Sequence, residues 1–276
     1  MTDAFDLIAP VVEAAKQNIP REPGDYAKDG RLFCGKCHTA KQTWVLGRLV
    51  PCRCSCSAQA AAKAESQQRE REKFERIARL RTSGLQDEKN RSARFETAEL
   101  SPQLEACRRY AERFQELCKE NIGLLLWGAP GTGKTFAASC IANSLIDSLI
   151  PVMQTSFSKI IADLQADSKN MRQILDGLGQ YDVLILDDLG TERQSAYALQ
   201  LMYDVVDARY SDRKPLIVTT NLSLSDLKNP SDMAHQRIFG RIQEMCTPIR
   251  FDGENRRAVA AEAKLKAARS ILGVTQ

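Results

Sequence analysis

A glycine-rich segment has the residue types and spacing of a phosphate site. It fits the pattern G-x-x-x-x-G-K-[ST] and lies between a short apolar run and a segment of helix-forming residues. Its glycines let backbone N–H groups turn toward a phosphate, and the following helix adds the partial positive charge of its N-terminus. We expect this segment to bind a nucleoside triphosphate. The alternative is a glycine-rich turn without ligand. The residues are Gly128, Ala129, Pro130, Gly131, Thr132, Gly133, Lys134 and Thr135.

Within this segment two side chains have separate tasks. Lys134 would neutralise the β- and γ-phosphates, and the Thr135 hydroxyl would bind Mg²⁺.

Two carboxylates follow the apolar run 183–186, about 53 residues after Lys134. Strands of open α/β sheets present ligand groups at their carboxyl ends, so Asp187 and Asp188 would lie near the phosphate segment. We expect Asp187 to hold Mg²⁺ through water and Asp188 to polarise the attacking water. Taken alone, a strand followed by two aspartates is also a common turn.

A third apolar run, 215–220, ends in Asn221, which could orient the attacking water or simply cap a helix. Downstream arginines could stabilise charge in a phosphoryl-transfer transition state, and such arginines can come from a neighbouring subunit. We hypothesise that Arg241 acts in this way on a neighbour, against the plainer interpretation of a solvated surface arginine. The four arginines are Arg237, Arg241, Arg256 and Arg257.

Five of the nine cysteines fall within 23 residues, with the spacing of a tetrahedral zinc site. We expect Cys34, Cys37 and Cys52 as ligands, completed by Cys54 or, in its place, by Cys56. His38 is a weaker candidate, and a redox or iron–sulfur role is the alternative. A closed site of this kind is structural and supplies folding energy to a small domain. The scattered cysteines are expected to be small buried apolar side chains: Cys107, Cys118, Cys140 and Cys246.

Short apolar runs alternate with longer helical segments after residue 95, which predicts βαβ units on a parallel sheet. Before it we expect a short helix within residues 1–20, two small strands around Gly47, and a mostly exposed helix over 57–82. The length of 276 residues suits about two domains. We therefore expect a zinc-binding partner domain over 1–56, a helical linker over 57–94 and the α/β domain over 95–276. Expected core strands are near 123–127, 151–155, 182–186, 215–220 and 247–251, and expected helices near 102–119, 134–149, 157–167, 168–178, 194–210, 232–245 and beyond 251.

The formal net charge is +4, but its distribution is uneven. Residues 41–94 carry 13 basic and 6 acidic side chains, and residues 250–276 carry 6 and 3. These basic segments favour a polyanionic partner, with solvated helix faces as the alternative. No stretch of about 18 apolar residues could span a membrane, and the acidic N-terminus lacks the features of a signal peptide. We expect no membrane contact and a cytoplasmic location.

Five motifs in this order resemble the AAA+ ATPases of the initiator and helicase-loader clade: GAPGTGKT, VLILDDLG, PLIVTTNLS, RIFGRI and FDGENRR. The resemblance covers residues 95–257 and is nearest to DnaC-like and DnaI-like loaders, whose core the transposition ATPase IstB shares. It implies a P-loop core with a five-stranded parallel sheet and no separate helical lid. It also implies that Asn221 is the sensor I residue, Arg241 the arginine finger and Arg257 the sensor II residue. The segment ARFETAEL would lie beside the adenine of ATP.

The same resemblance implies a function. The chain would be an ATPase, weak and stimulated by DNA or partner, that loads a hexameric replicative helicase onto single-stranded DNA and self-associates on ATP or DNA. The zinc domain would grip the helicase. Single-stranded DNA would run along residues 154–159, where Phe157 could stack on a base and Lys159 could pair with a phosphate, unless Phe157 packs in the core. Alternatives are an IstB-like ATPase directing a transposase, or a nucleotide-gated DNA-binding adaptor with little turnover.

Overall fold

The computed structural model describes residues 21–99, 101–166, 171–191, 195–230 and 232–272. The helix expected within residues 1–20 lies outside this part of the chain. Two compact units divide between Glu75 and Arg76, inside helix α2 (Ser55–Gly84). Each unit is described by itself below.

The N-terminal unit contains two small antiparallel hairpins. Strand β1 (Tyr26–Lys28) pairs with β2 (Arg31–Phe33), and β3 (Gln42–Val45) pairs with β4 (Arg48–Pro51). The second hairpin turns at Gly47, as expected. The first was not expected, because its strands have three residues each and too short a pattern for alternation to be recognised.

Helix α2 forms over 30 residues without proline and with a single glycine at its end. Its exposed stretch is supported by side-chain contacts one turn apart, such as the 2.6 Å ion pair from Arg69 to Glu65. This is the helix expected over 57–82, extended by two residues at each end.

The C-terminal unit is built on a five-stranded sheet in which every neighbouring pair is parallel. The strand order is β6-β7-β8-β5-β9. Strand β5, which comes first in the sequence, therefore lies between β8 and β9, the last two. This confirms the predicted parallel α/β sheet. The strands are β5 (Gly123–Trp127), β6 (Val152–Thr155), β7 (Val183–Leu189), β8 (Leu216–Thr220) and β9 (Cys246–Arg250).

Helices cover both faces of the sheet. The helix expected over 102–119 is two helices, because the backbone at Arg113 leaves the helical region with φ −102° and ψ 17°. Three short elements, α3, η1 and α10, have five residues or fewer and were not expected. The bounds are α3 (Glu88–Ser92), η1 (Phe95–Thr97), α4 (Pro102–Glu112), α5 (Phe114–Lys119), α6 (Lys134–Asp147), α7 (Phe157–Ala166), α8 (Met171–Gly179), α9 (Ala196–Ser211), α10 (Leu224–Lys228), α11 (Met233–Met245) and α12 (Arg256–Leu272).

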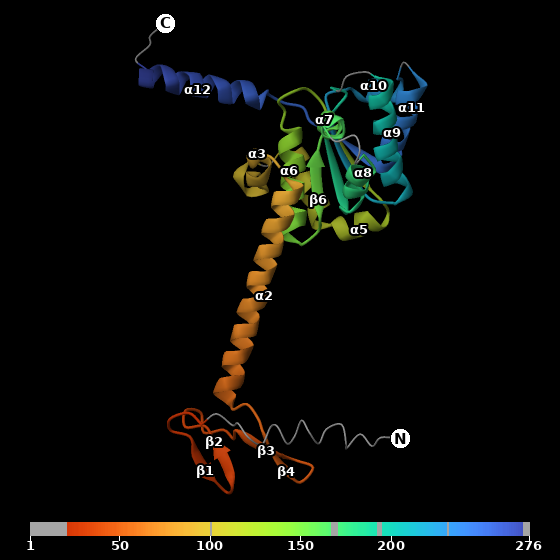
Figure 1. Ribbon diagram of the computed structural model, residues 1–276. Helices are drawn as coiled ribbons and strands as arrows, with labels where there is room; N and C mark the ends of the chain where they lie inside the picture. Colours follow the sequence, from red (N-terminus) through yellow and green to blue (C-terminus); the bar gives the residue numbers. More distant parts are fainter. Residues whose placement is uncertain (1–20, 100, 167–170, 192–194, 231, 273–276) are drawn as a thin grey trace, which may run out of the picture. The chain divides into compact units, whose positions relative to one another are not determined.

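Two apolar clusters fill the space between sheet and helices. Alternate residues of β5 divide between them: Leu124 and Leu126 face α4 and α6, whereas Leu125 faces α7, α9 and α11. Figure 1 shows α6 on one side of the strands and α9 with α11 on the other. Among the four scattered cysteines, three are buried as expected and Cys118 is half-buried. None of the described helices is both long and apolar enough to cross a membrane.

Candidate nucleotide and metal sites

The P-loop (residues 128–135) connects β5 to α6 at the carboxyl edge of the sheet. Gly128 has φ +138°, and a Cβ atom there would lie 2.1 Å from the Phe251 carbonyl oxygen. Gly131 has φ +82°, and a Cβ atom would lie 2.0 Å from the Asn255 side-chain oxygen. Gly128 therefore requires glycine because a side chain would collide with the backbone at Phe251, and Gly131 favours glycine because its backbone is left-handed.

Lys134 is 5% exposed and begins α6. Its ammonium group donates hydrogen bonds of 2.8 Å to the Gly128 and Ala129 carbonyl oxygens and to Asn221 Oδ1. Burial lowers the pKa of the Lys134 ammonium. Three acceptors thus hold the lysine beside the loop. A phosphate oxygen could compete with them for its hydrogen bonds.

Asp187 lies at the end of β7, opposite the first turn of α6. Its Oδ1 atom accepts hydrogen bonds from Thr135 Oγ1 at 2.9 Å and from Thr219 Oγ1 at 2.5 Å. Burial raises the pKa of the Asp187 carboxyl, and the two hydroxyl groups oppose this shift. A carboxylate and a hydroxyl held together in this way are oxygen ligands of the kind that Mg²⁺ prefers.

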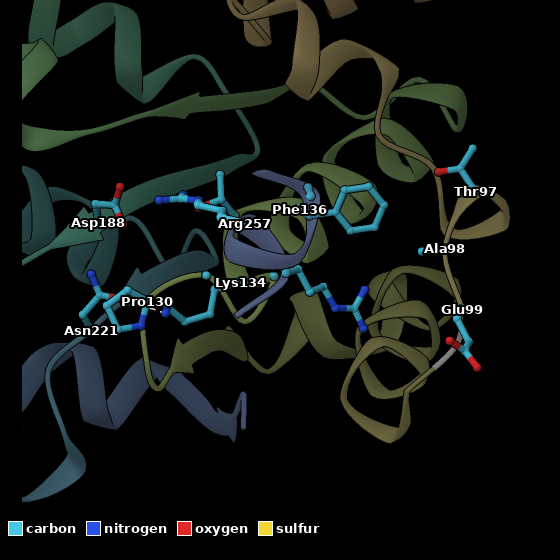
Figure 2. A pocket seen from close by; sticks show the side chains of 14 residues that line it. Thr97, Ala98, Glu99, Pro130, Lys134, Phe136, Asp188, Asn221 and Arg257 are labelled. Atoms are coloured by element: carbon cyan, nitrogen blue, oxygen red, sulfur yellow. Dashed lines mark hydrogen bonds between the residues drawn. The ribbon is translucent and has the colours of Figure 1, made fainter. Parts of the chain in front are cut away.

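A cavity of about 560 Å³ opens beside these groups. At one end lie the P-loop, Asp188, Asn221 and Arg257, and Figure 2 shows the Arg257 side chain reaching from α12 toward Asp188. The P-loop with the start of α6, the end of β7, the residue that follows β8, and α12 therefore contribute polar groups to one end of the cavity. The arrangement combines donors for phosphate oxygens with a carboxylate that could act on water.

The other end of the cavity is lined by Thr97, Ala98, Glu99 and Phe136. Phe136 offers an aromatic ring, and the 97–99 segment offers backbone groups and a carboxylate. This is the segment that the resemblance to the loaders places beside adenine. A flat, partly polar base could fit between these residues while its phosphates reach the P-loop.

Arg256, one of the four arginines singled out from the sequence, also lines the cavity. Its backbone N–H donates to the Gly131 carbonyl oxygen at 3.0 Å. This contact ties the start of α12 to the P-loop.

Arg241 does not line this cavity. Its guanidinium group forms a 2.7 Å ion pair with Asp207 and lies over the rings of Tyr203 and Tyr210, with centroid distances of 4.4 and 5.6 Å. Arg237, one turn earlier on α11, is exposed. Within its own chain, Arg241 thus joins α11 to α9.

The cysteine cluster differs from the expected one in a single ligand. The sulfur atoms of Cys34, Cys37, Cys54 and Cys56 all lie within 4.8 Å of one another. Cys52 is not part of this group, and its thiol donates to the Ala40 carbonyl oxygen at 3.4 Å. The expectation that Cys52 is a ligand is therefore wrong, and Cys54 and Cys56 both belong to the cluster.

The distances suit a zinc ion. A tetrahedral ion with four thiolates at about 2.3 Å requires sulfur atoms about 3.8 Å apart. Cys56 Sγ lies 3.6 Å from Cys34 Sγ and 3.4 Å from Cys54 Sγ. A hydrogen bond with Thr39 lowers the pKa of Cys37 to about 5, whereas one with Cys54 raises the pKa of Cys56 to about 12. The chain can therefore hold zinc through four sulfur atoms.

The two residues expected to contact DNA differ in their exposure. Phe157 is 1% exposed and packs in the core with Ile160 and Leu164. Stacking of Phe157 on a base is therefore excluded, because residues 157, 160 and 164 form the buried stripe of α7. Lys159 lies between these positions and is half-buried.

Comparison with known proteins agrees with this geometry. Residues 59–262 match the family model described as IstB-like ATP binding protein. The phage-like element PBSX protein XkdC of Bacillus subtilis is 30% identical over 151 residues, which are 52% of this chain and 55% of that protein. The replicative helicase loader DnaI of Bacillus subtilis is 29% identical over 147 residues, 49% of this chain and 47% of that protein.

The chain thus spans about half the length of the curated relatives it matches. Among solved structures, the crystal structure of DnaI aligns with a TM-score of 0.54 at 25% identity, covering 64% of this chain and 99% of that one. The fold is accordingly that of the AAA+ proteins, as the motifs implied. A family match over well more than half of the residues leads to one conclusion: the chain belongs to the IstB-like ATP binding protein family.

Proposed function

We propose that this protein is an ATPase that loads a replicative DNA helicase onto single-stranded DNA. The observation that carries the ATPase part is the convergence of Lys134, Asp188, Asn221 and Arg257 around one cavity. Asp187 lies behind its lining and accepts a hydrogen bond from Thr135, which does line it. The loader part is supported by a relative named as a helicase loader and by the likeness to the DnaI structure.

In this proposal the P-loop backbone and Lys134 bind the β- and γ-phosphates of ATP. Thr135 and Asp187 would hold Mg²⁺, which neutralises phosphate charge when bound. Asp188 draws a proton from the attacking water, and Asn221 orients that water. Arg257, which lies on α12, pairs with the γ-phosphate. Turnover is slow without DNA or partner, because Asp188 has a shorter arm than glutamate and reaches the water less closely.

The N-terminal region would recognise the helicase. We propose the boundaries 1–56 for a partner domain held together by zinc, 57–94 for a linker and 95–276 for the ATPase domain. The four-sulfur cluster supports the zinc part, since so small a region has little core of its own. The helicase would be hexameric.

Subunits would associate when ATP or DNA binds, and Arg241 would then act on the nucleotide of a neighbour. Lys159 would contact the DNA backbone. Its location in the first turn of α7, four residues after β6 ends, supports this, because the other polar groups also follow the carboxyl ends of strands.

A second candidate is an ATPase that directs a transposase, which the family name IstB favours. The experiment that separates the two is co-purification of the full chain with the host replicative helicase and, in parallel, with a transposase, each with and without ATP. Retention of the helicase supports the loader. Retention of the transposase alone would overturn it. ATPase activity measured with and without single-stranded DNA tests a third candidate, an adaptor with negligible turnover.

A further inference from the structure

Strand β7 is irregular at the point where it carries the two aspartates. Leu186 pairs with Val218 of β8, and Leu189 pairs with Thr220. Two residues of β7, Asp187 and Asp188, therefore face the single residue Thr219 between those pairs. This is a β-bulge, and Asp188 occupies it with a left-handed backbone, φ +57°.

The bulge changes which way the side chains of β7 point. Leu184 and Leu186 belong to the cluster on the α9 face, whereas Val183 and Ile185 belong to the opposite cluster. Strict alternation would place residue 189 with 183 and 185, but Leu189 lies with 184 and 186. The reversal shows that the extra residue is accommodated at Asp187–Asp188. Without it, the two carboxylates would point to opposite faces of the sheet.

The Thr219 side chain occupies the single position that faces both aspartates. It is fully buried. Its hydroxyl oxygen accepts a hydrogen bond from the Asp188 backbone N–H at 2.9 Å. Because the Asp188 N–H can only donate, the hydroxyl proton is left for the other contact. That contact is the 2.5 Å hydrogen bond donated to Asp187 Oδ1.

We propose that Thr219 is a positioning residue that fixes both aspartates of the ATPase site through one hydroxyl group. The donated bond orients the Asp187 carboxylate toward the Thr135 hydroxyl, with which it would hold Mg²⁺, and the accepted bond holds the bulge that turns Asp188 into the cavity. The inference rests on the proposed ATPase activity and adds a residue to its machinery. Strained backbone at a site persists where surrounding contacts hold it in place.

The test compares Thr219→Val with Thr219→Ser and with Thr220→Val. Valine removes the hydroxyl at nearly constant volume, and serine restores it. Thr220 is the matched control, because it is also fully buried in β8 and its hydroxyl donates to the Leu189 carbonyl oxygen at 2.7 Å. Circular dichroism and thermal unfolding establish that each variant folds. Thr219→Ala, which lacks the hydroxyl without the added methyl group, replaces the valine variant if that one does not fold.

Two quantities are measured. The first is binding of a fluorescent, non-hydrolysable ATP analogue as Mg²⁺ is added. Without metal, we expect Thr219→Val to bind the analogue as the wild type does. It should need about tenfold more Mg²⁺ to reach half of the increase in analogue binding that the metal causes, because a hydrogen bond to a charged group is lost. The second is the effect on kcat and on KM for ATP at saturating Mg²⁺: kcat should fall, because Asp188 is no longer held in the bulge, while KM changes little. Thr219→Ser should resemble the wild type in both.

The outcomes separate this inference from the proposed function. If the wild type neither binds the analogue with Mg²⁺ nor hydrolyses ATP, the proposed ATPase is overturned. If the wild type does both, and Thr219→Val matches Thr220→Val in metal requirement and in kcat, the ATPase stands and the role of Thr219 is overturned.

Discussion

The Lys134 ammonium group and the Asn221 amide oxygen lie 2.8 Å apart, although the residues are 87 positions apart in sequence. The contact joins the P-loop to the end of β8, the neighbouring strand. Asn221 thus accepts a hydrogen bond from the lysine, and a bound phosphate could take its place. The amide released in that way would be free to bind water beside the phosphate.

Asn221→Ala should therefore separate binding from turnover. We expect kcat to fall about 100-fold, the scale of losing one aligned polar group at a transition state, while KM changes less than about threefold. Lys134→Ala is the comparison: it should weaken ATP binding itself by about tenfold or more, because a buried charged donor to the phosphates is removed. Steady-state kinetics and equilibrium nucleotide binding measure both. An Asn221→Ala variant that loses binding as strongly as Lys134→Ala would contradict the proposed division of roles.

A second prediction follows from the partly buried charge of Asp187. Burial raises the pKa of this carboxyl in the folded protein, so protonation is easier in the folded than in the unfolded chain. Its contribution to stability is therefore largest below the ordinary carboxyl pKa and is lost as pH rises through the raised value. At neutral pH without metal, Asp187→Asn should raise the unfolding temperature while abolishing Mg²⁺-dependent ATPase activity.

Thermal unfolding at pH 5 and pH 7.5 measures this effect. The stabilisation by Asp187→Asn should be larger at pH 7.5, because the wild-type carboxylate is more fully charged there. Asp188→Asn is the control, since Asp188 lines the open cavity whereas Asp187 does not. A lower unfolding temperature for Asp187→Asn at pH 7.5 would show that the charge of Asp187 does not destabilise the fold.

The sequence predicted the strands and the positions of the site residues at their ends, because those signals are local. The P-loop needs glycines at set positions, and continuous apolar runs mark buried parallel strands. The bulge at Asp187–Asp188 has no such local signal. It arises from the pairing of β7 with β8, and for this reason Thr219 was not recognised.

The zinc ligands illustrate the same limit. Cys52, Cys54 and Cys56 are evenly spaced in sequence, so spacing alone does not select among them. The choice depends on where the strand ends and the helix begins. Strand β4 ends at Pro51 and α2 begins at Ser55, which brings Cys56 into the first helical turn beside Cys54. Phe157 is different, because the apolar positions 157, 160 and 164 already had the spacing of a buried helical stripe.

This cluster yields a third prediction. Cys56→Ala should lower the zinc content well below one ion per chain, whereas Cys52→Ala should retain one ion. The reason is that Cys56 Sγ lies 3.4 Å from Cys54 Sγ, while the Cys52 thiol bonds the Ala40 carbonyl oxygen. Emission spectrometry of the purified full chain gives the metal content. Equal loss of zinc in both variants would contradict the four-sulfur assignment. A wild-type protein without zinc would contradict the zinc site itself.

A fourth prediction concerns the arginines of α11. Arg241 is held by Asp207 and two tyrosine rings, whereas Arg237 is exposed. If Arg241 acts on a neighbour's nucleotide, mixing Arg241→Ala subunits into wild type should lower ATPase activity more steeply than their fraction, because each variant subunit impairs a neighbour. Asp207→Asn should then raise activity by weakening the ion pair that retains the arginine.

The matched variant is Arg237→Ala, titrated in the same way. A linear decline for Arg241→Ala together with a steeper one for Arg237→Ala would transfer the role to Arg237. A linear decline for both would mean that neither arginine acts between subunits.

The last prediction separates the two residues first expected to contact DNA. Lys159→Ala should weaken binding of single-stranded DNA and reduce the slope of log K against log salt by about 0.7, the value for one phosphate contact on a single strand. Phe157→Leu should lower the unfolding temperature, because its ring is buried among Ile160 and Leu164, but should leave that slope unchanged. Fluorescence anisotropy at several salt concentrations, run below the unfolding temperature of each variant, measures both. An unchanged slope for Lys159→Ala would place the DNA elsewhere, and the basic residues of 41–94 would become the next positions to test.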